Sequence, residues 1–150
     1  MANIVNRLLN YLDFKSIEVS VRYLSISAFF TGVGLGYFFI LIVILLKHNN
    51  YSDSTIGIIA AFFSFGLMSA GLIVSKILEK LGLYRTMLIS ISIQTLMVII
   101  IFAYFSPVVI AICHLVMGIL GGIMWMTMDT WVNIVSNNMN RGKAIAFYNL

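Results

Sequence analysis

The side chains most able to do chemistry lie within long apolar runs of the sequence. His114 lies about seven residues into the run that begins at Val108, or ~10 Å along a helix. Its titration range suits proton transfer, although a neutral core histidine bonded to nearby backbone is an equally simple interpretation. Gln94 and Tyr37 can bind a solute or bond a neighbouring helix. His114, Tyr37 and Gln94 are therefore the candidates for a substrate or proton site.

Charged residues lie at the ends of these apolar runs. Asp129 lies about 21 residues into its run, or ~30 Å along a helix, and therefore near one membrane surface. Basic neighbours would offset the cost of a partly buried carboxylate, whereas the alternative is a solvated acid at a helix end. We expect a charge cluster at this surface, made of Glu79, Lys80, Gly82, Arg85, Asp129, Arg141 and Lys143.

No arrangement typical of an enzyme or a metal centre occurs in the sequence. It contains no HExxH, no GxSxG and no phosphate-binding glycine loop. The single cysteine, Cys113, leaves no internal disulfide and no cysteine-based metal site. His114 and Asp129 lie too far apart in depth to act together. We therefore predict no catalytic residues, no metal and no cofactor.

The elements that must position these residues are membrane helices. Hydrophobic residues make up 61% of the chain and charged residues only 9%, whereas a soluble domain carries about 25% charged residues. The mean hydropathy is +1.05, so the lipid bilayer is the solvent that this composition fits. The basic residues fall in short clusters between apolar runs, which indicates membrane topology rather than nucleic-acid binding.

The sequence predicts an all-α membrane protein with four transmembrane helices and the start of a fifth. Residues 1–22 carry several charges and lack the compact apolar segment of a signal peptide, so we predict an N-terminal tail. Residues 23–150 form the predicted transmembrane domain. Its spans are expected at about 23–46, 54–75, 86–105 and 108–135, with a truncated fifth from about 142.

Three shorter features refine this topology. Residues 76–85 are expected to form a short charged loop in which Gly82 permits a turn with positive φ. Pro107 suits the first turn of the fourth span. Small residues favour close packing of helices; they are Gly32, Gly34 and Gly36 in the first span, Gly66 and Ala70 in the second, and Gly118, Gly121 and Gly122 in the fourth.

Lysine and arginine residues lie almost entirely on one side of the predicted membrane. Lys47 is the one basic residue expected on the opposite side. The side rich in basic residues carries Arg7, Lys15, Arg22, Lys76, Lys80, Arg85, Arg141 and Lys143. Because positive charges stay in the cytoplasm, we predict a cytoplasmic N-terminus in a multi-pass protein of the cell membrane, the inner membrane if bacterial.

Two stretches of sequence resemble the major facilitator superfamily. Residues 75–85 resemble the loop signature between its second and third helices, with Glu79-Lys80 in place of an Asp-Arg pair. Residues 129–133, Asp-Thr-Trp-Val-Asn, followed by residues 140–143, Asn-Arg-Gly-Lys, look like a bacterial branch of drug-efflux-like permeases. His114 stands four residues before Gly118, where the superfamily usually has an arginine.

The resemblance implies a secondary transporter that moves a small-molecule solute by alternating access. Superfamily members have two six-helix halves with the substrate between them, so the chain would be the N-terminal portion of such a bundle. A second polypeptide is one source of the missing helices, and protons are the suspected coupling ion. The charge cluster around Asp129 would act as a latch that gates rocking of the halves.

Two other hypotheses remain open from the sequence. One is a complete four-helix protein that acts as an oligomeric small-drug exporter, a class that depends on a glutamate in the first span. Residues 23–46 contain no acidic residue, which counts against this hypothesis. The other is a packing protein or a remnant that transports nothing.

Overall fold

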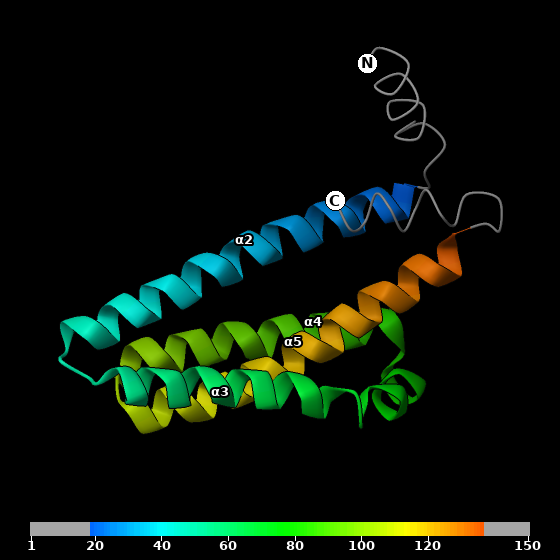
Figure 1. Ribbon diagram of the computed structural model, residues 1–150. Helices are drawn as coiled ribbons and strands as arrows, with labels where there is room; N and C mark the ends of the chain where they lie inside the picture. Colours follow the sequence, from blue (N-terminus) through cyan, green and yellow to red (C-terminus); the bar gives the residue numbers. More distant parts are fainter. Residues whose placement is uncertain (1–18, 137–150) are drawn as a thin grey trace, which may run out of the picture. The chain divides into compact units, whose positions relative to one another are not determined.

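Four α-helices make up the part of the chain that the structure describes. The computed structural model describes residues 19–136 and contains α2 (Val19–His48), α3 (Asp53–Ala70), α4 (Val74–Ala103) and α5 (Pro107–Val135) (Figure 1). Each helix is long and apolar enough to cross a membrane. The prediction of an all-α membrane protein is confirmed, whereas most of the N-terminal tail and the fifth segment from about 142 lie outside the described residues.

The chain forms two compact units. The first contains residues 1–38 and 129–150, and the second contains residues 39–128. The second unit therefore holds the end of α2, all of α3 and α4, and most of α5. It also holds His114, Gln94 and the predicted loop at 76–85.

A short polar turn joins α2 to α3. Ser52 caps α3, since its hydroxyl accepts a hydrogen bond from the Thr55 backbone N–H at 3.3 Å. Asn50 has a φ of 60°, a left-handed conformation that asparagine tolerates. Lys47 forms a salt bridge with Asp53 across this turn. The turn is thus held by a cap and an ion pair, both on the exposed surface.

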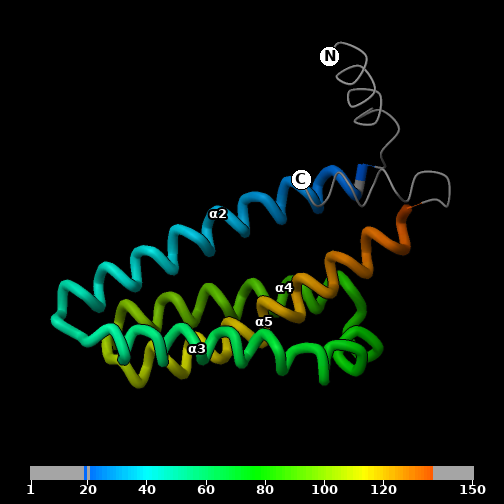
Figure 2. The backbone as a smooth tube through the Cα atoms, viewed as in Figure 1, coloured from blue at the N-terminus to red at the C-terminus, as the bar shows by residue number. Residues whose placement is uncertain are grey.

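Close backbone contact joins α3 to α5. A Cβ atom added at Gly66 would lie 2.9 Å from the Ile119 nitrogen, and one added at Gly118 would lie 3.1 Å from the Leu67 nitrogen. Farther along, a Cβ at Gly122 would lie 3.1 Å from the Leu67 carbonyl oxygen. The two helices therefore run parallel and side by side (Figure 2), as the small residues of these spans predict.

The glycines of the first span behave differently. Among the described residues, a Cβ atom added at Gly32, Gly34 or Gly36 would meet nothing within 4 Å. The GxxxG spacing of Gly32 and Gly36 therefore accompanies no close helix contact in this part of the chain. Spacing alone does not specify a packed neighbour.

The segment predicted as a charged loop is mostly helical, and this prediction was wrong. α4 begins at Val74, eight residues before a break at Gly82, whose φ is 72° and ψ 170°. The apolar residues of 74–81 recur at helical spacing, and this pattern favours a helix that packs on one side. The positive φ expected at Gly82 is confirmed.

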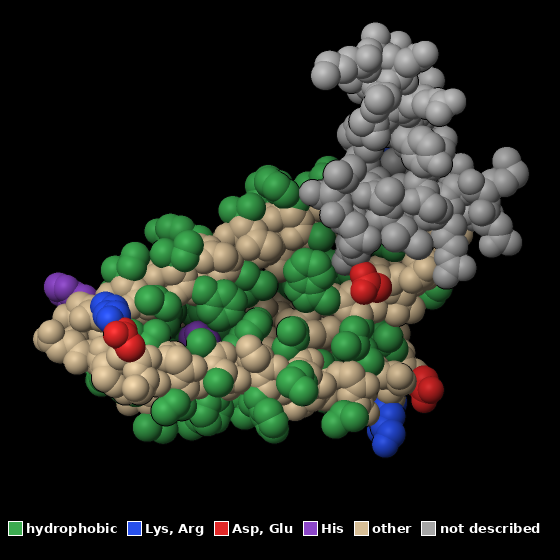
Figure 3. Space-filling model, in the orientation of Figure 1, with side chains coloured by type: hydrophobic (Ala, Val, Ile, Leu, Met, Phe, Trp, Pro, Cys, Tyr) green, Lys and Arg blue, Asp and Glu red, His purple; other side chains and the backbone are tan. Residues whose placement is uncertain are grey.

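Apolar side chains cover the lengths of the helices, and charged side chains lie toward their ends (Figure 3). Phe30 in α2, Phe65 in α3, Ile99 in α4 and Val108 in α5 each expose more than half of their side-chain surface. Exposing so many apolar side chains to water would be unfavourable, whereas contact with lipid tails carries no such cost.

Candidate functional site

His114 lies on the buried face of α5 in the second unit. Its side chain is only 2% exposed. The ring nitrogen Nδ1 lies 2.9 Å from the Ile110 carbonyl oxygen. Because a carbonyl oxygen only accepts hydrogen bonds, Nδ1 must carry the proton and donate it. This hydrogen bond holds the ring against its own helix, which is the contact expected of a neutral core histidine bonded to nearby backbone.

Phe39 lies against His114 and in turn contacts Phe63, and the sequence did not predict this aromatic cluster. The Phe39 ring lies 5.7 Å from the His114 ring, with an angle of 60° between their planes. Phe39 also meets Phe63 edge to face at 4.7 Å. All three residues lie about seven to ten residues from the helix ends at the turns 49–52 and 104–106, so ~10–15 Å deep. The distance of each residue from the end of its span therefore indicates that Phe39, Phe63 and His114 lie at a similar depth in the membrane.

The α3–α5 crossing lies next to this aromatic cluster. Gly118 follows His114 by one helical turn, and Phe63 precedes Gly66 by about one turn. A Cβ atom at Gly118 would meet the Phe63 backbone, with its carbonyl carbon 3.0 Å away. The close approach of the two helices therefore sets the position of both Phe63 and His114.

Gln94 lies on α4 in the same unit. Its Nε2 atom is buried and has no hydrogen-bond partner among residues 19–136. Ser90 and Thr86 precede it at intervals of one turn, and both are 2% exposed. The Thr86 hydroxyl donates to the Gly82 carbonyl oxygen at 2.7 Å. These three residues give α4 a polar stripe on its buried side.

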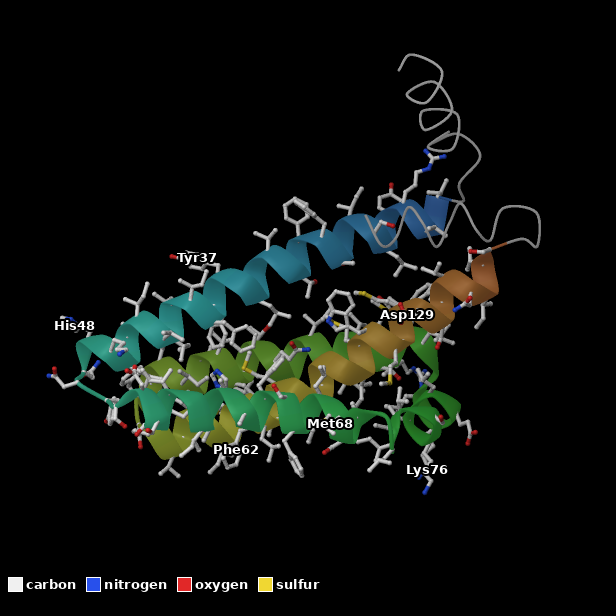
Figure 4. All side chains as sticks on the ribbon, in the orientation of Figure 1. Tyr37, His48, Phe62, Met68, Lys76 and Asp129 are labelled. Atoms are coloured by element: carbon white, nitrogen blue, oxygen red, sulfur yellow. The ribbon has the colours of Figure 1, made fainter. Side chains whose placement is uncertain are left out.

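Tyr37 belongs to the first unit, unlike His114 and Gln94. Its side chain is 69% exposed and points away from α2 (Figure 4). The three predicted residues of the substrate or proton site are therefore divided between the two units. Tyr37 stays a candidate on the sequence argument alone.

The predicted charge cluster is divided between the units. Glu79, Lys80, Gly82 and Arg85 are exposed residues of the second unit, whereas Asp129 is an exposed residue of the first. Arg141 and Lys143 lie outside the described residues. The cluster thus stays a prediction, and within residues 19–136 no group of three or more His, Cys, Asp or Glu residues is arranged to hold a metal ion.

Four apolar helices with a buried histidine and glycine-mediated helix contacts define a polytopic membrane protein. The family model described as Major Facilitator Superfamily matches residues 24–150, and the chain belongs to this superfamily. It is therefore a member of a transporter family. Comparisons with curated proteins and with solved structures give no match.

Proposed function

We propose that the chain supplies the first helices of a secondary transporter that moves small solutes by alternating access and uses a proton gradient. The observation that carries this proposal is His114, a buried ionisable residue within a span of a superfamily member. Ionisable side chains inside membrane spans are costly and commonly mark ion or substrate pathways. Among the described residues of α5, His114 combines burial within the span with a side chain able to take up and release a proton.

The aromatic cluster supports a role for His114 in coupling. Phe39 lies against the His114 ring, and the ring is 2% exposed, so a charge on His114 would be poorly solvated there. A cation–π contact with Phe39 offsets part of that cost. Protonation would thus disturb the contacts between α2, α3 and α5 at this level, and movement of these helices is what alternating access requires.

Asp129 and the basic residues near the same membrane surface are proposed to gate this movement. Lys80 and Arg85 are exposed at the start of α4, where they are accessible to a carboxylate partner. A pair that forms in one state and breaks in the other shifts the balance between states rather than the affinity for solute. Asp129→Asn should therefore change the rate of transport more than the apparent affinity.

The proposed orientation places the N-terminus and Lys80 in the cytoplasm and His48 outside. Its support is the excess of lysine and arginine on one side of the four spans. Cysteine labelling at position 48 in a Cys113→Ser background tests it. Modification only from the cytoplasmic side would reverse the orientation.

The proton-coupling proposal is tested in vesicles that contain the chain as part of a complete two-halved superfamily bundle. Addition of a transported solute should move protons, read with a pH-sensitive dye. His114→Asn should abolish the proton movement, whereas Cys113→Ser, at the neighbouring buried position, should preserve it. Equal proton movement in the His114→Asn variant would remove His114 from the coupling mechanism.

A further inference from the structure

The helical segment 74–81 has one face packed on the protein and one face exposed. Val74 is 8% exposed and joins the buried cluster of Ala70 in α3 and Ile123 in α5, and Ile77 and Leu78 pack against the same cluster. The packed residues recur at i, i+3 and i+4, the spacing of one helix face. This segment is therefore held against the end of α3 and an interior position of α5.

The opposite face of the segment carries charge. Lys76, Glu79 and Lys80 are all exposed, and Lys76 points away from the helices (Figure 4). Arg85 is exposed just beyond the break at Gly82. Three basic residues against one acidic residue leave this face with a positive net charge.

Apolar side chains flank the charged face. Leu72 is 83% exposed, Ile73 39% and Tyr84 64%. A leucine and an isoleucine exposed beside lysines would be unfavourable in water but suit the boundary between lipid headgroups and acyl chains. Tyrosine also favours this boundary.

The length of α3 places these residues at that boundary. Its 18 residues reach ~27 Å, close to the ~30 Å thickness of the hydrocarbon core. Residues 72–85 therefore begin where the acyl chains end. Gly82 is the point at which the chain leaves the interfacial segment and enters the long part of α4.

We propose that residues 72–85 form a binding surface for the phosphate headgroups of anionic phospholipids, with Lys76, Lys80 and Arg85 contacting the phosphates and Leu72, Ile73 and Tyr84 entering the boundary layer. Charge complementarity selects this partner, since lysine and arginine near an anionic leaflet are attracted to it. A soluble acidic partner protein would leave the exposed Leu72 and Ile73 at the lipid boundary without a role. The inference rests on the geometry of this segment and not on the transport mechanism.

A fluorophore near the lysines can report which lipid lies beside them. The whole chain carries Ser75→Cys with Cys113→Ser, is labelled at position 75 and is placed in phosphatidylcholine vesicles. Quenching is compared between equal mole fractions of brominated phosphatidylglycerol and brominated phosphatidylcholine. The anionic lipid should quench more strongly, and 1 M salt should reduce the difference because it screens the attraction.

Three variants separate headgroup binding from general contact with lipid. Lys76→Gln with Lys80→Gln should lower the preference for the anionic lipid by about fivefold per lysine. Glu79→Gln, on the same face, should raise it. Lys47→Gln, at the opposite end of the helices and paired with Asp53, should leave it unchanged.

Circular dichroism verifies that each charge variant keeps its helices, as expected from the exposure of the replaced lysine and glutamate side chains. Equal quenching by the two lipids in the chain with native lysines would overturn the proposal. A preference that survives replacement of both lysines would overturn it as well. A lower preference in Glu79→Gln would show that the charges of this face do not select the lipid.

Discussion

Glycine serves two different purposes in the second unit, one at the α3–α5 crossing and one at the break in α4. At Gly66 and Gly118 the helices approach so closely that an added Cβ atom would meet backbone atoms of the partner helix. At Gly82 nothing lies within 4 Å of the Cβ position, yet φ is 72° and ψ 170°. The α3–α5 crossing requires glycine because neighbouring backbone atoms leave no room for a side chain. The break at Gly82 requires glycine because of its own backbone conformation.

The two glycine sites also differ in how far the helices around them can move. Contact between two helix backbones cannot yield without moving a whole helix. The break at Gly82 instead has nothing within 4 Å of its Cβ position, although residues 74–78 before it pack on α3 and α5. We therefore expect α3, α5 and the start of α4 to move together, with reorientation allowed in the part of α4 that follows Gly82.

Gly118→Val should have the largest effect. Its side chain would enter space occupied by the Phe63 backbone, and we expect a loss of about 3 kcal/mol or more in unfolding free energy, at the upper end for overpacked cores. Gly121→Ala is the matched control, because its Cβ would lie 4.0 Å from the Phe63 ring at the nearest. Reversible unfolding in mixed micelles measures both. Equal stability of the two variants would mean that the backbones are not in contact.

Gly82→Ala should have a smaller effect through the backbone alone. The φ and ψ of Gly82 fall in a region that is almost restricted to glycine, so we expect a cost of about 1–3 kcal/mol. Gly82→Asn should not restore stability, since asparagine tolerates the left-handed helical region rather than this one.

Gly57→Ala provides the control for the Gly82 variant. Gly57 lies within α3 with nothing near its Cβ position, and alanine there should stabilise the helix slightly. If Gly82→Ala behaved like Gly57→Ala, the break in α4 would not require glycine and the contrast between the two regions would fail.

Four membrane-spanning helices were predictable from the sequence, because long apolar runs separated by breaks such as 47–53 and Ser106-Pro107 leave few alternatives. The helical character of 74–81 was missed because its charges obscured the apolar spacing of Val74, Ile77 and Leu78. The burial of His114 was expected, whereas its contact with Phe39 depends on which faces of α2 and α5 meet. A single sequence does not specify that choice.

Thr86→Val should have the smallest effect. It removes the hydrogen bond from the Thr86 hydroxyl to the Gly82 carbonyl oxygen while preserving the side-chain shape, at a cost of about 0.5–1.5 kcal/mol. Thr95→Val, which removes the bond to the Ile91 carbonyl from an exposed side chain, is the control in the same helix. A larger loss of unfolding free energy in Thr95→Val than in Thr86→Val would show that the Thr86 hydroxyl does not specifically stabilise the break at Gly82.

Our central proposal is that these helices function as part of a larger transporter bundle. Solute uptake by the 150 residues alone tests this proposal most directly. Vesicles containing only this chain are given an inward or outward proton gradient and a panel of labelled drug-like cations. We predict no saturable, gradient-driven uptake, because the superfamily binds its substrate between two halves. Reproducible uptake that His114→Ala abolishes would contradict the account and favour a small oligomeric exporter.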